Sequence, residues 1–179
     1  MQIKNTSLRY GNIAIYLHWI LAVIIIGMLI LGLYMTTLPD TVNKFKLYRW
    51  HKEWGVVVLM LAVIRLIWRA NNVAPLLQLP WWEKMAAHGA HYALYFFMFS
   101  MPLTGWLMSS AAGFSVSFFG IFILPDLVPN SEPLRKLFGM AHEWLGYGLI
   151  ATIIGHAGAA FQHHFIYKDD ILRRMLPWK

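Results

Sequence analysis

The chain has 179 residues, of which 59% are hydrophobic and only 13% are charged, whereas soluble domains average about 45–50% apolar and about 25% charged residues. A soluble fold of this length cannot bury so much apolar surface, so the composition predicts a membrane protein and excludes a disordered chain. The absence of cysteine excludes disulfides and Cys-ligated metals, and the net charge of +7 comes without a basic run, so no nucleic-acid partner is expected.

Four apolar segments are candidates for membrane-spanning helices, each of which needs about 20 apolar residues. They cover about residues 13–35, 50–69, 91–111 and 139–165. The third contains Pro102, which we expect to kink the helix without ending it, because neighbouring helices can satisfy the freed backbone groups. The sequence therefore predicts a single all-α domain over residues 1–179, an integral membrane four-helix bundle that crosses the bilayer several times.

A fifth apolar segment, residues 114–124 (FSVSFFGIFIL), is too short to span the bilayer as a helix. Three prolines follow it closely, at positions 125, 129 and 133. We expect this segment to be an interfacial or re-entrant cap on the bundle.

The basic residues predict the orientation of the bundle, because Lys and Arg are in excess on the cytoplasmic side. One side of the predicted topology carries nine of the 15 Lys and Arg residues, and the other carries six, from Lys44 to Lys52 and at Arg135 and Lys136. The side with nine includes both ends of the chain, so both termini are predicted to be cytoplasmic.

Two histidines on the fourth span predict two separate cofactor sites. His142 and His156 are 14 residues apart, which places them about 21 Å apart on nearly the same helix face. One metal ion cannot bind both, but two stacked cofactors can, and imidazole is a common haem ligand. The second and fourth spans run in the same direction, so His51 lies at the depth of His142 and no other histidine does. An outer bis-histidine site would therefore use His51 and His142.

Two glycines have the same offset from these histidines. Gly55 and Gly146 each follow their histidine by four residues, on the same face one turn deeper. A flat macrocycle can pack closely against a helix only where no side chain projects, as at a glycine. Small residues that ease helix–helix packing explain the glycines as well, but not the matched offset.

The inner site is less well defined. His18 and His156 match in depth, and glycines at 155 and 158 favour His156 beside a large planar group. Four other histidines compete near the surface, namely His88, His91, His163 and His164. An interfacial polar face explains His88 and His91, and a contact with haem propionates is the other interpretation.

Arg65 lies on the face of His51, 14 residues further along the second span, and so is about 21 Å deeper, level with the inner site. It could bind haem propionates through charge-assisted hydrogen bonds. The competing interpretation is that its side chain reaches the cytoplasmic surface, beside Arg69.

The histidine pattern resembles the bacterial cytochrome b561 family. The matching motifs are Leu17-His18-Trp19, Trp50-His51, Ala87-His88-Gly89-Ala90-His91, His142, Gly155-His156-Ala157-Gly158, His163-His164-Phe165 and the basic tail from Lys168. Such proteins are four-helix dihaem cytochromes b of the bacterial inner membrane. The resemblance implies two haem b groups, one bound by His18 and His156 and the other by His51 and His142.

The resemblance also implies an electron-transfer activity. One member of the family is a superoxide oxidase, which passes electrons from periplasmic superoxide through the haems to ubiquinone. Other members are cytochrome b subunits that connect the quinone pool to a partner dehydrogenase, hydrogenase or reductase. A shared fold does not choose between them.

A basic cluster at the start of the second span favours the superoxide oxidase. The cluster comprises Lys44, Lys46, Arg49 and Lys52, opposed only by Asp40 and Glu53. It could steer a small anion to the outer site, or it could contact lipid head groups. A divalent-metal transporter is a third interpretation, but it requires intramembrane carboxylates along a pathway, and Glu53 and Glu143 lie only at the outer rim.

Overall fold

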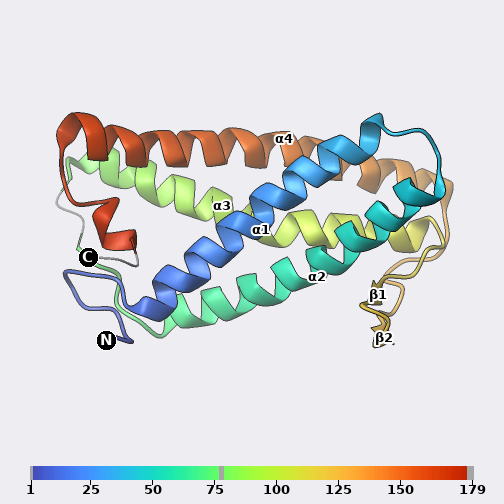
Figure 1. Cartoon of the computed structure of the whole chain (residues 1–179), viewed down its shortest axis with the longest axis horizontal. Helices are drawn as coiled ribbons and strands as arrows, with labels where there is room; N and C mark the ends of the chain where they lie inside the picture. The colour runs from blue at the N-terminus through green and yellow to red at the C-terminus, as the bar shows by residue number, and fades with distance from the viewer. Residues whose placement is uncertain (1, 77–78, 177–179) are drawn as a thin grey trace.

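The computed structural model describes residues 2–76 and 79–176. Four long helices make up most of the chain: α1 (Asn12–Thr37), α2 (Val42–Ala70), α3 (Trp81–Ala111) and α4 (Glu132–Gln162). They run back and forth along the molecule, so both ends of the chain lie at the same end of the bundle (Figure 1). The expectation of an all-α chain is confirmed, with one small hairpin as an exception.

Local signals in the sequence account for the helix boundaries. Thr41 caps α2, because its hydroxyl accepts the backbone N–H of Lys44 at 3.4 Å. Pro133 lies in the first turn of α4, where a missing N–H costs nothing. Helix α3 continues through Pro102, as expected from its place beside other helices. A side chain at Gly11 would collide with the backbone of Ile3, which crosses the start of α1.

Two of the described helices are long and apolar enough to cross a membrane, α1 and the helical stretch Glu132–Tyr167. The spans expected near residues 50–69 and 91–111 lie inside α2 and α3. Charged and histidine side chains along α2 and α3 lower their hydropathy. That these two helices also cross the bilayer stays a prediction.

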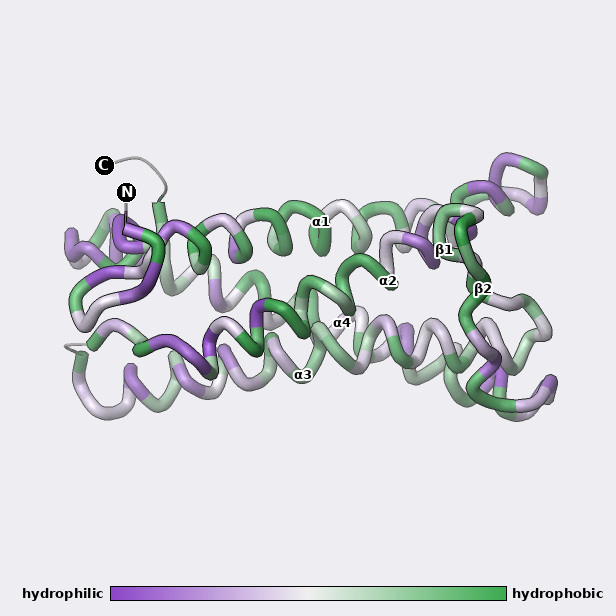
Figure 2. The backbone as a smooth tube through the Cα atoms, turned by 90° about the horizontal axis from the view of Figure 1, so that it is seen from below, coloured by the Kyte–Doolittle hydropathy of each residue, from purple (hydrophilic) through white to green (hydrophobic). Residues whose placement is uncertain are grey.

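The bundle is built from two helical hairpins. Helix α1 packs along α2, α3 packs along α4, and α2 also contacts α3. Midway along the bundle, Leu21, Val58, Ala62 and Met98 form a buried cluster from three helices. Large apolar side chains elsewhere point outward, for example Val23 and Ile154, which are 68% and 67% exposed. Figure 2 shows hydrophilic residues gathered toward the two ends, as expected for a bundle whose middle faces lipid.

The apolar segment 114–124 forms a β-hairpin at the end of the bundle opposite the termini (Figure 1). Strand β1 (Ser117–Phe118) pairs with β2 (Phe122–Ile123) in antiparallel register, Ser117 opposite Ile123. The turn between them has φ of 49° at Phe119 and 75° at Gly120, and the Ile121 N–H donates to the Phe118 carbonyl at 2.9 Å. Positive φ at both central residues is the mark of a type I′ turn.

The C-terminal residues fold back over the opposite end of the bundle. After α4 the chain forms a short π-helix, η1 (His163–Tyr167), and a short 3₁₀ helix, η2 (Arg173–Met175). The Trp19 indole N–H donates to the Met175 carbonyl at 2.6 Å, and the Arg174 guanidinium donates to the Leu76 carbonyl at 3.0 Å. These bonds connect the C-terminal segment to α1 and to the α2–α3 connection.

Candidate metal centres

His51 of α2 and His142 of α4 face each other at the hairpin end of the bundle. Their ring centroids are 6.2 Å apart, with an interplanar angle of 77°. With metal–nitrogen bonds of about 2 Å, two imidazoles on one iron have ring centres roughly 6 Å apart. The spacing of this outer pair therefore fits a single iron between the rings.

The hydrogen bonds of His142 select one tautomer. Its Nδ1 lies 3.0 Å from the Met101 carbonyl and 3.1 Å from the Thr104 hydroxyl. A carbonyl can only accept, so Nδ1 carries the hydrogen and Nε2 keeps its lone pair. A histidine that binds a metal through one nitrogen and donates from the other is the usual arrangement, because the second bond orients the ring. His142 is thus oriented for ligation through Nε2.

Two glycines that the sequence analysis did not select contact these rings. A Cβ at Gly32 would lie 3.3 Å from His51 Cε1, and one at Gly105 would lie 3.2 Å from His142 Cε1. Both glycines lie on neighbouring helices, so no offset along a single helix marks them. A Cβ at Gly55 would instead lie 4.0 Å from the terminal methyl group of Met28, and one at Gly146 would lie 3.7 Å from that of Met101. Both methionine side chains are flexible, which leaves room for a planar group beside the two glycines.

Three histidines meet at the end of the bundle where the termini lie. The ring centroids of His18 and His156 are 6.2 Å apart, the same separation as in the outer pair. His91 lies 5.7 Å from His156, also centroid to centroid. The structure therefore brings together the two histidines that the resemblance selects, and it places His91 as a third imidazole beside them.

Arg65 lies beside His18 and not at the surface. Its Nη2 is 3.1 Å from His18 Nδ1, and its guanidinium lies 5.9 Å above the ring of Tyr95. An arginine can only donate, so in this contact Nδ1 of His18 accepts and Nε2 carries the hydrogen. Iron ligation through Nε2 requires the opposite tautomer. Arg65 must then turn away from His18, which would free its guanidinium for a carboxylate such as a haem propionate.

The remaining inner histidines have other surroundings. The Nδ1–H of His163 donates to the Asp169 carboxylate at 2.6 Å, and its Nε2 lies 3.9 Å from Glu83. With both ring nitrogens facing carboxylates, His163 is a poor candidate for an iron ligand. His88 is exposed.

The basic cluster lies at the outer end, and three of its four side chains have partners. Lys44 Nζ is 2.9 Å from Asp40, which raises the pKa of Lys44 through their hydrogen bond. Lys52 Nζ donates to the Ser109 hydroxyl at 3.2 Å, and Arg49 Nε lies 3.9 Å from Glu53. Lys46 is exposed. The positive charge available to an approaching anion is therefore smaller than the residue count indicates.

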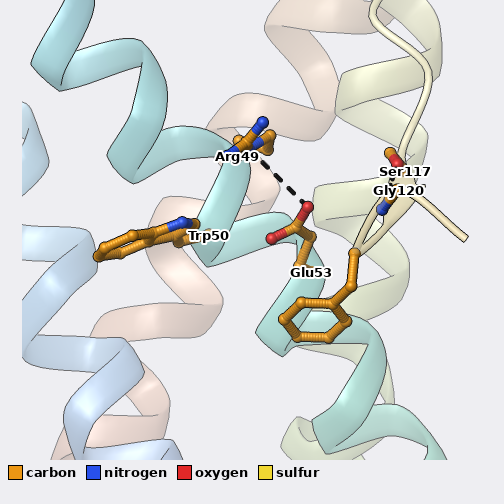
Figure 3. A pocket seen from close by; sticks show the side chains of 6 residues that line it. Arg49, Trp50, Glu53, Ser117 and Gly120 are labelled. Atoms are coloured by element: carbon orange, nitrogen blue, oxygen red, sulfur yellow. Dashed lines mark hydrogen bonds and ion pairs between the residues drawn. The ribbon is translucent and has the colours of Figure 1, made fainter.

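A pocket of about 360 Å³ lies beside this cluster, between the start of α2 and the β1–β2 hairpin (Figure 3). No local signal in the sequence shows that the hairpin reaches α2. The pocket is lined by Arg49, Trp50, Glu53, Ser117, Phe119 and Gly120.

Two known proteins and one family model are similar to this chain over almost its full length. A family model described as prokaryotic cytochrome b561 matches residues 9–178. Cytochrome b561 homolog 2 of Escherichia coli (strain K12) is 36% identical over 179 aligned residues, 98% of this chain and 95% of that protein. Cytochrome b561 homolog 1 of the same organism is also 36% identical, over 94% of this chain and 97% of that protein. A Yersinia pestis protein named "Probable superoxide oxidase CybB" is 28% identical, over 72% of this chain and 74% of that protein.

Proposed function

Because the chain belongs to the prokaryotic cytochrome b561 family of haem-b-binding membrane proteins, we propose that it is a superoxide:ubiquinone oxidoreductase of the bacterial inner membrane. In this proposal it is a dihaem cytochrome with both termini in the cytoplasm. His51 and His142 hold the outer haem, and His18 and His156 hold the inner one. The haem iron supplies reversible one-electron chemistry when bound.

The overall reaction balances as two superoxide anions and one ubiquinone. Each superoxide loses one electron and leaves as dioxygen. Ubiquinone takes up the two electrons and two protons and leaves as ubiquinol. The chain's own residues would orient the axial imidazoles, exclude water from the bundle interior and attract the anion to the outer end.

The observation that carries the proposal is the position of the basic cluster. Lys46 and Arg49 lie within two turns of His51 on α2, at the end of the bundle that holds the His51–His142 pair. A local positive field of this kind accelerates the arrival of a small anion. The printed name of the Yersinia pestis relative supports the same donor.

The test is haem reduction by pulse-generated superoxide, followed optically in detergent, and then reoxidation by added ubiquinone. Replacing the four cluster residues by Gln should slow reduction by roughly threefold to tenfold and weaken its dependence on ionic strength. Lys84→Gln, at the opposite end of the bundle, is the matched control and should behave like the unmodified protein. Reduction no faster than the spontaneous dismutation of superoxide would overturn the proposal.

A second candidate function is a cytochrome b subunit that passes electrons between the quinone pool and a partner dehydrogenase, hydrogenase or reductase. The pairing of Lys44, Arg49 and Lys52 with neighbouring side chains favours it, because paired charges steer anions less well. Copurification of such an enzyme in mild detergent, together with no reduction by superoxide, would select this function.

A further inference from the structure

We propose that the pocket between α2 and the β1–β2 hairpin binds the head group of ubiquinone. The inference rests on the proposed function in one respect, the identity of a quinone as the electron acceptor. Figure 3 shows Arg49 and Glu53 of α2 on one side of the pocket and Ser117 and Gly120 of the hairpin on the other, with the Trp50 ring pointing away from the hairpin.

The polar groups of the pocket suit both redox forms of a quinone. The Arg49 guanidinium can only donate, which suits a quinone carbonyl oxygen, and the ionised Glu53 carboxylate can only accept, which suits a quinol hydroxyl. The Phe119 ring supplies apolar surface for a flat ring. A donor, an acceptor and an aromatic wall within one pocket form a site for an uncharged aromatic molecule with oxygens on its rim.

Glu53 is the buried carboxylate of the pocket. It is only 4% exposed. The Arg49 Nε lies 3.9 Å away, too far for a hydrogen bond, and Lys52 is a second positive charge nearby. A buried carboxylate is costly unless hydrogen bonds satisfy its oxygens. A hydroxyl bound in the pocket would supply such a bond. A superoxide anion would instead be repelled by the same carboxylate, which argues against the pocket as the anion site.

The hairpin holds Phe119 in a strained conformation beside the pocket. Its φ of 49° lies in the left-handed region, which costs a residue with a bulky side chain conformational energy and persists mainly at functional sites. This backbone places the Phe119 ring edge-on to Trp54, with centroids 6.0 Å apart. The strained turn therefore connects the hairpin to α2 and completes the pocket wall.

The surface around the pocket indicates that its ligand arrives from lipid. Ile121 and Ile123 of the hairpin are 76% and 70% exposed, and Trp50 and Trp54 expose their rings on α2. Apolar side chains next to a membrane surface insert into the interface. A ligand with an isoprenoid tail could reach the pocket along this surface, with its tail still in the bilayer.

The pocket also lies at the depth of the outer histidine pair. Trp50 and Glu53 flank His51 in sequence, within about 3 Å along the axis of the same helix. A head group bound there is at the level of His51 and His142, and not at the end where the termini lie.

The first test labels the unmodified, haem-loaded protein with an azido-ubiquinone and identifies the labelled peptides by mass spectrometry. Label within residues 49–54 or 117–120, displaced by excess ubiquinone-1, is the expected result. Specific label confined to other parts of the chain would overturn the proposal.

The second test fills the pocket. Ser117→Phe should weaken ubiquinone-1 binding at least tenfold, measured by equilibrium dialysis, and should slow reoxidation of the dithionite-reduced protein by ubiquinone-1. Ser115→Phe is the matched control, because Ser115 is exposed on the same hairpin outside the pocket, and its affinity should stay unchanged. Equal affinity in Ser117→Phe and the unmodified protein would overturn the proposal. If Ser117→Phe does not fold, Glu53→Gln serves as the second variant and should bind ubiquinol more weakly.

The two proposals fail separately. Neither the labelling nor the dithionite experiment uses superoxide, so a protein that superoxide does not reduce can still carry the quinone pocket. A protein that superoxide reduces, but whose specific azidoquinone label lies elsewhere, keeps the proposed donor and loses the pocket.

Discussion

Two of the proposed ligand histidines, His142 and His18, differ in which ring nitrogen carries the hydrogen. Nδ1 of His142 donates to the Met101 carbonyl, so its Nε2 is available to a metal. Nδ1 of His18 instead accepts from Arg65, so its Nε2 carries the hydrogen. If these histidines hold iron, the imidazole of His142 is already oriented for ligation through Nε2, whereas ligation by His18 through Nε2 would require Arg65 to move and His18 to change tautomer.

Alanine variants of the four proposed ligands should fall into two pairs. His51→Ala and His142→Ala should remove the same haem and leave the other, and His18→Ala and His156→Ala should behave as the second pair, because each pair shares one iron. The measurement is haem quantification with reduced-minus-oxidised spectra, which should give two haems in the unmodified protein. One haem in that protein, or loss of the same haem in His51→Ala and His156→Ala, would contradict the pairing.

His91→Ala tests the third inner imidazole. It should retain both haems, because the resemblance assigns the inner iron to His18 and His156. Loss of the inner haem in His91→Ala, together with its retention in His18→Ala, would assign the iron to His91 and His156 instead.

The glycines beside the imidazoles should tolerate no side chain. Gly105→Ala introduces a Cβ at 3.2 Å from His142 Cε1, so the ring must shift, and we expect an altered spectrum for one haem. Gly27→Ala is the control, because a Cβ there meets no atom within 4 Å among the described residues. In the interior of a helix this control change should stabilise the protein by about 0.5–1 kcal/mol. Identical spectra for Gly105→Ala and the unmodified protein would show that the ring position is not constrained.

Among the elements, the two short segments outside the helices determine what each end of the bundle can do. The β1–β2 hairpin covers the start of α2 and forms one wall of the pocket. The C-terminal segment covers the other end and is bonded to Trp19 and to Leu76. The helices position the histidines, and these two segments cover the ends of the bundle.

The Asp170–Arg174 pair should make the C-terminal segment sensitive to acid. Arg174 lies 3.0 Å from Asp170, and this hydrogen bond lowers the pKa of Asp170. The stabilisation is therefore present above the unfolded pKa of about 3.9 and is lost as the pH falls through the lower folded value. Asp170 is largely exposed, so solvent screening limits the pair to less than about 1 kcal/mol.

Hydrogen exchange of residues 168–176 measures this effect. Asp170→Asn should increase exchange at neutral pH and make no difference once the pH is below the folded pKa. Arg173→Gln, an exposed neighbour outside the pair, should have no effect. Equal exchange in Asp170→Asn and the unmodified protein at neutral pH would remove the pair as a stabilising contact.

At the scale of the whole molecule, the fold separates the end that carries the termini from the end that carries the hairpin. Both termini lie at one end and the hairpin lies at the other (Figure 1). The His18–His156 pair belongs to the end with the termini, and the basic cluster and the His51–His142 pair belong to the end with the hairpin, as their positions along the helices show. Basic residues are more numerous at the end with the termini, which predicts that this end faces the cytoplasm.

Single introduced cysteines test the orientation without background, because the natural chain has no cysteine. In spheroplasts, a membrane-impermeant maleimide should label Asn43→Cys and should fail to label Ser7→Cys or Arg173→Cys until the membrane is permeabilised. The reverse pattern would place the termini in the periplasm.

What the sequence determined by itself follows from two lengths, the thickness of the bilayer and the rise of the α-helix per residue. Together they identify a membrane helical bundle, place His51 level with His142, and keep residues 114–124 out of the set of spanning helices. The family resemblance was confirmed by similarity over nearly the whole chain. The pairing of His18 with His156 as ligands of one iron, which the resemblance implies, stays a prediction.

Contacts between segments far apart in the chain were decided only by the tertiary structure. The position of Gly32 and Gly105 against the histidines, of Arg65 against His18 and of the hairpin over Glu53 each depends on how two elements cross. The partners of the basic cluster were also decided by the tertiary structure, because a count of residues gives the charge but not the distances between the charged groups. Helical periodicity specifies which face of its own helix a residue occupies, whereas the atom opposite that face is set by packing.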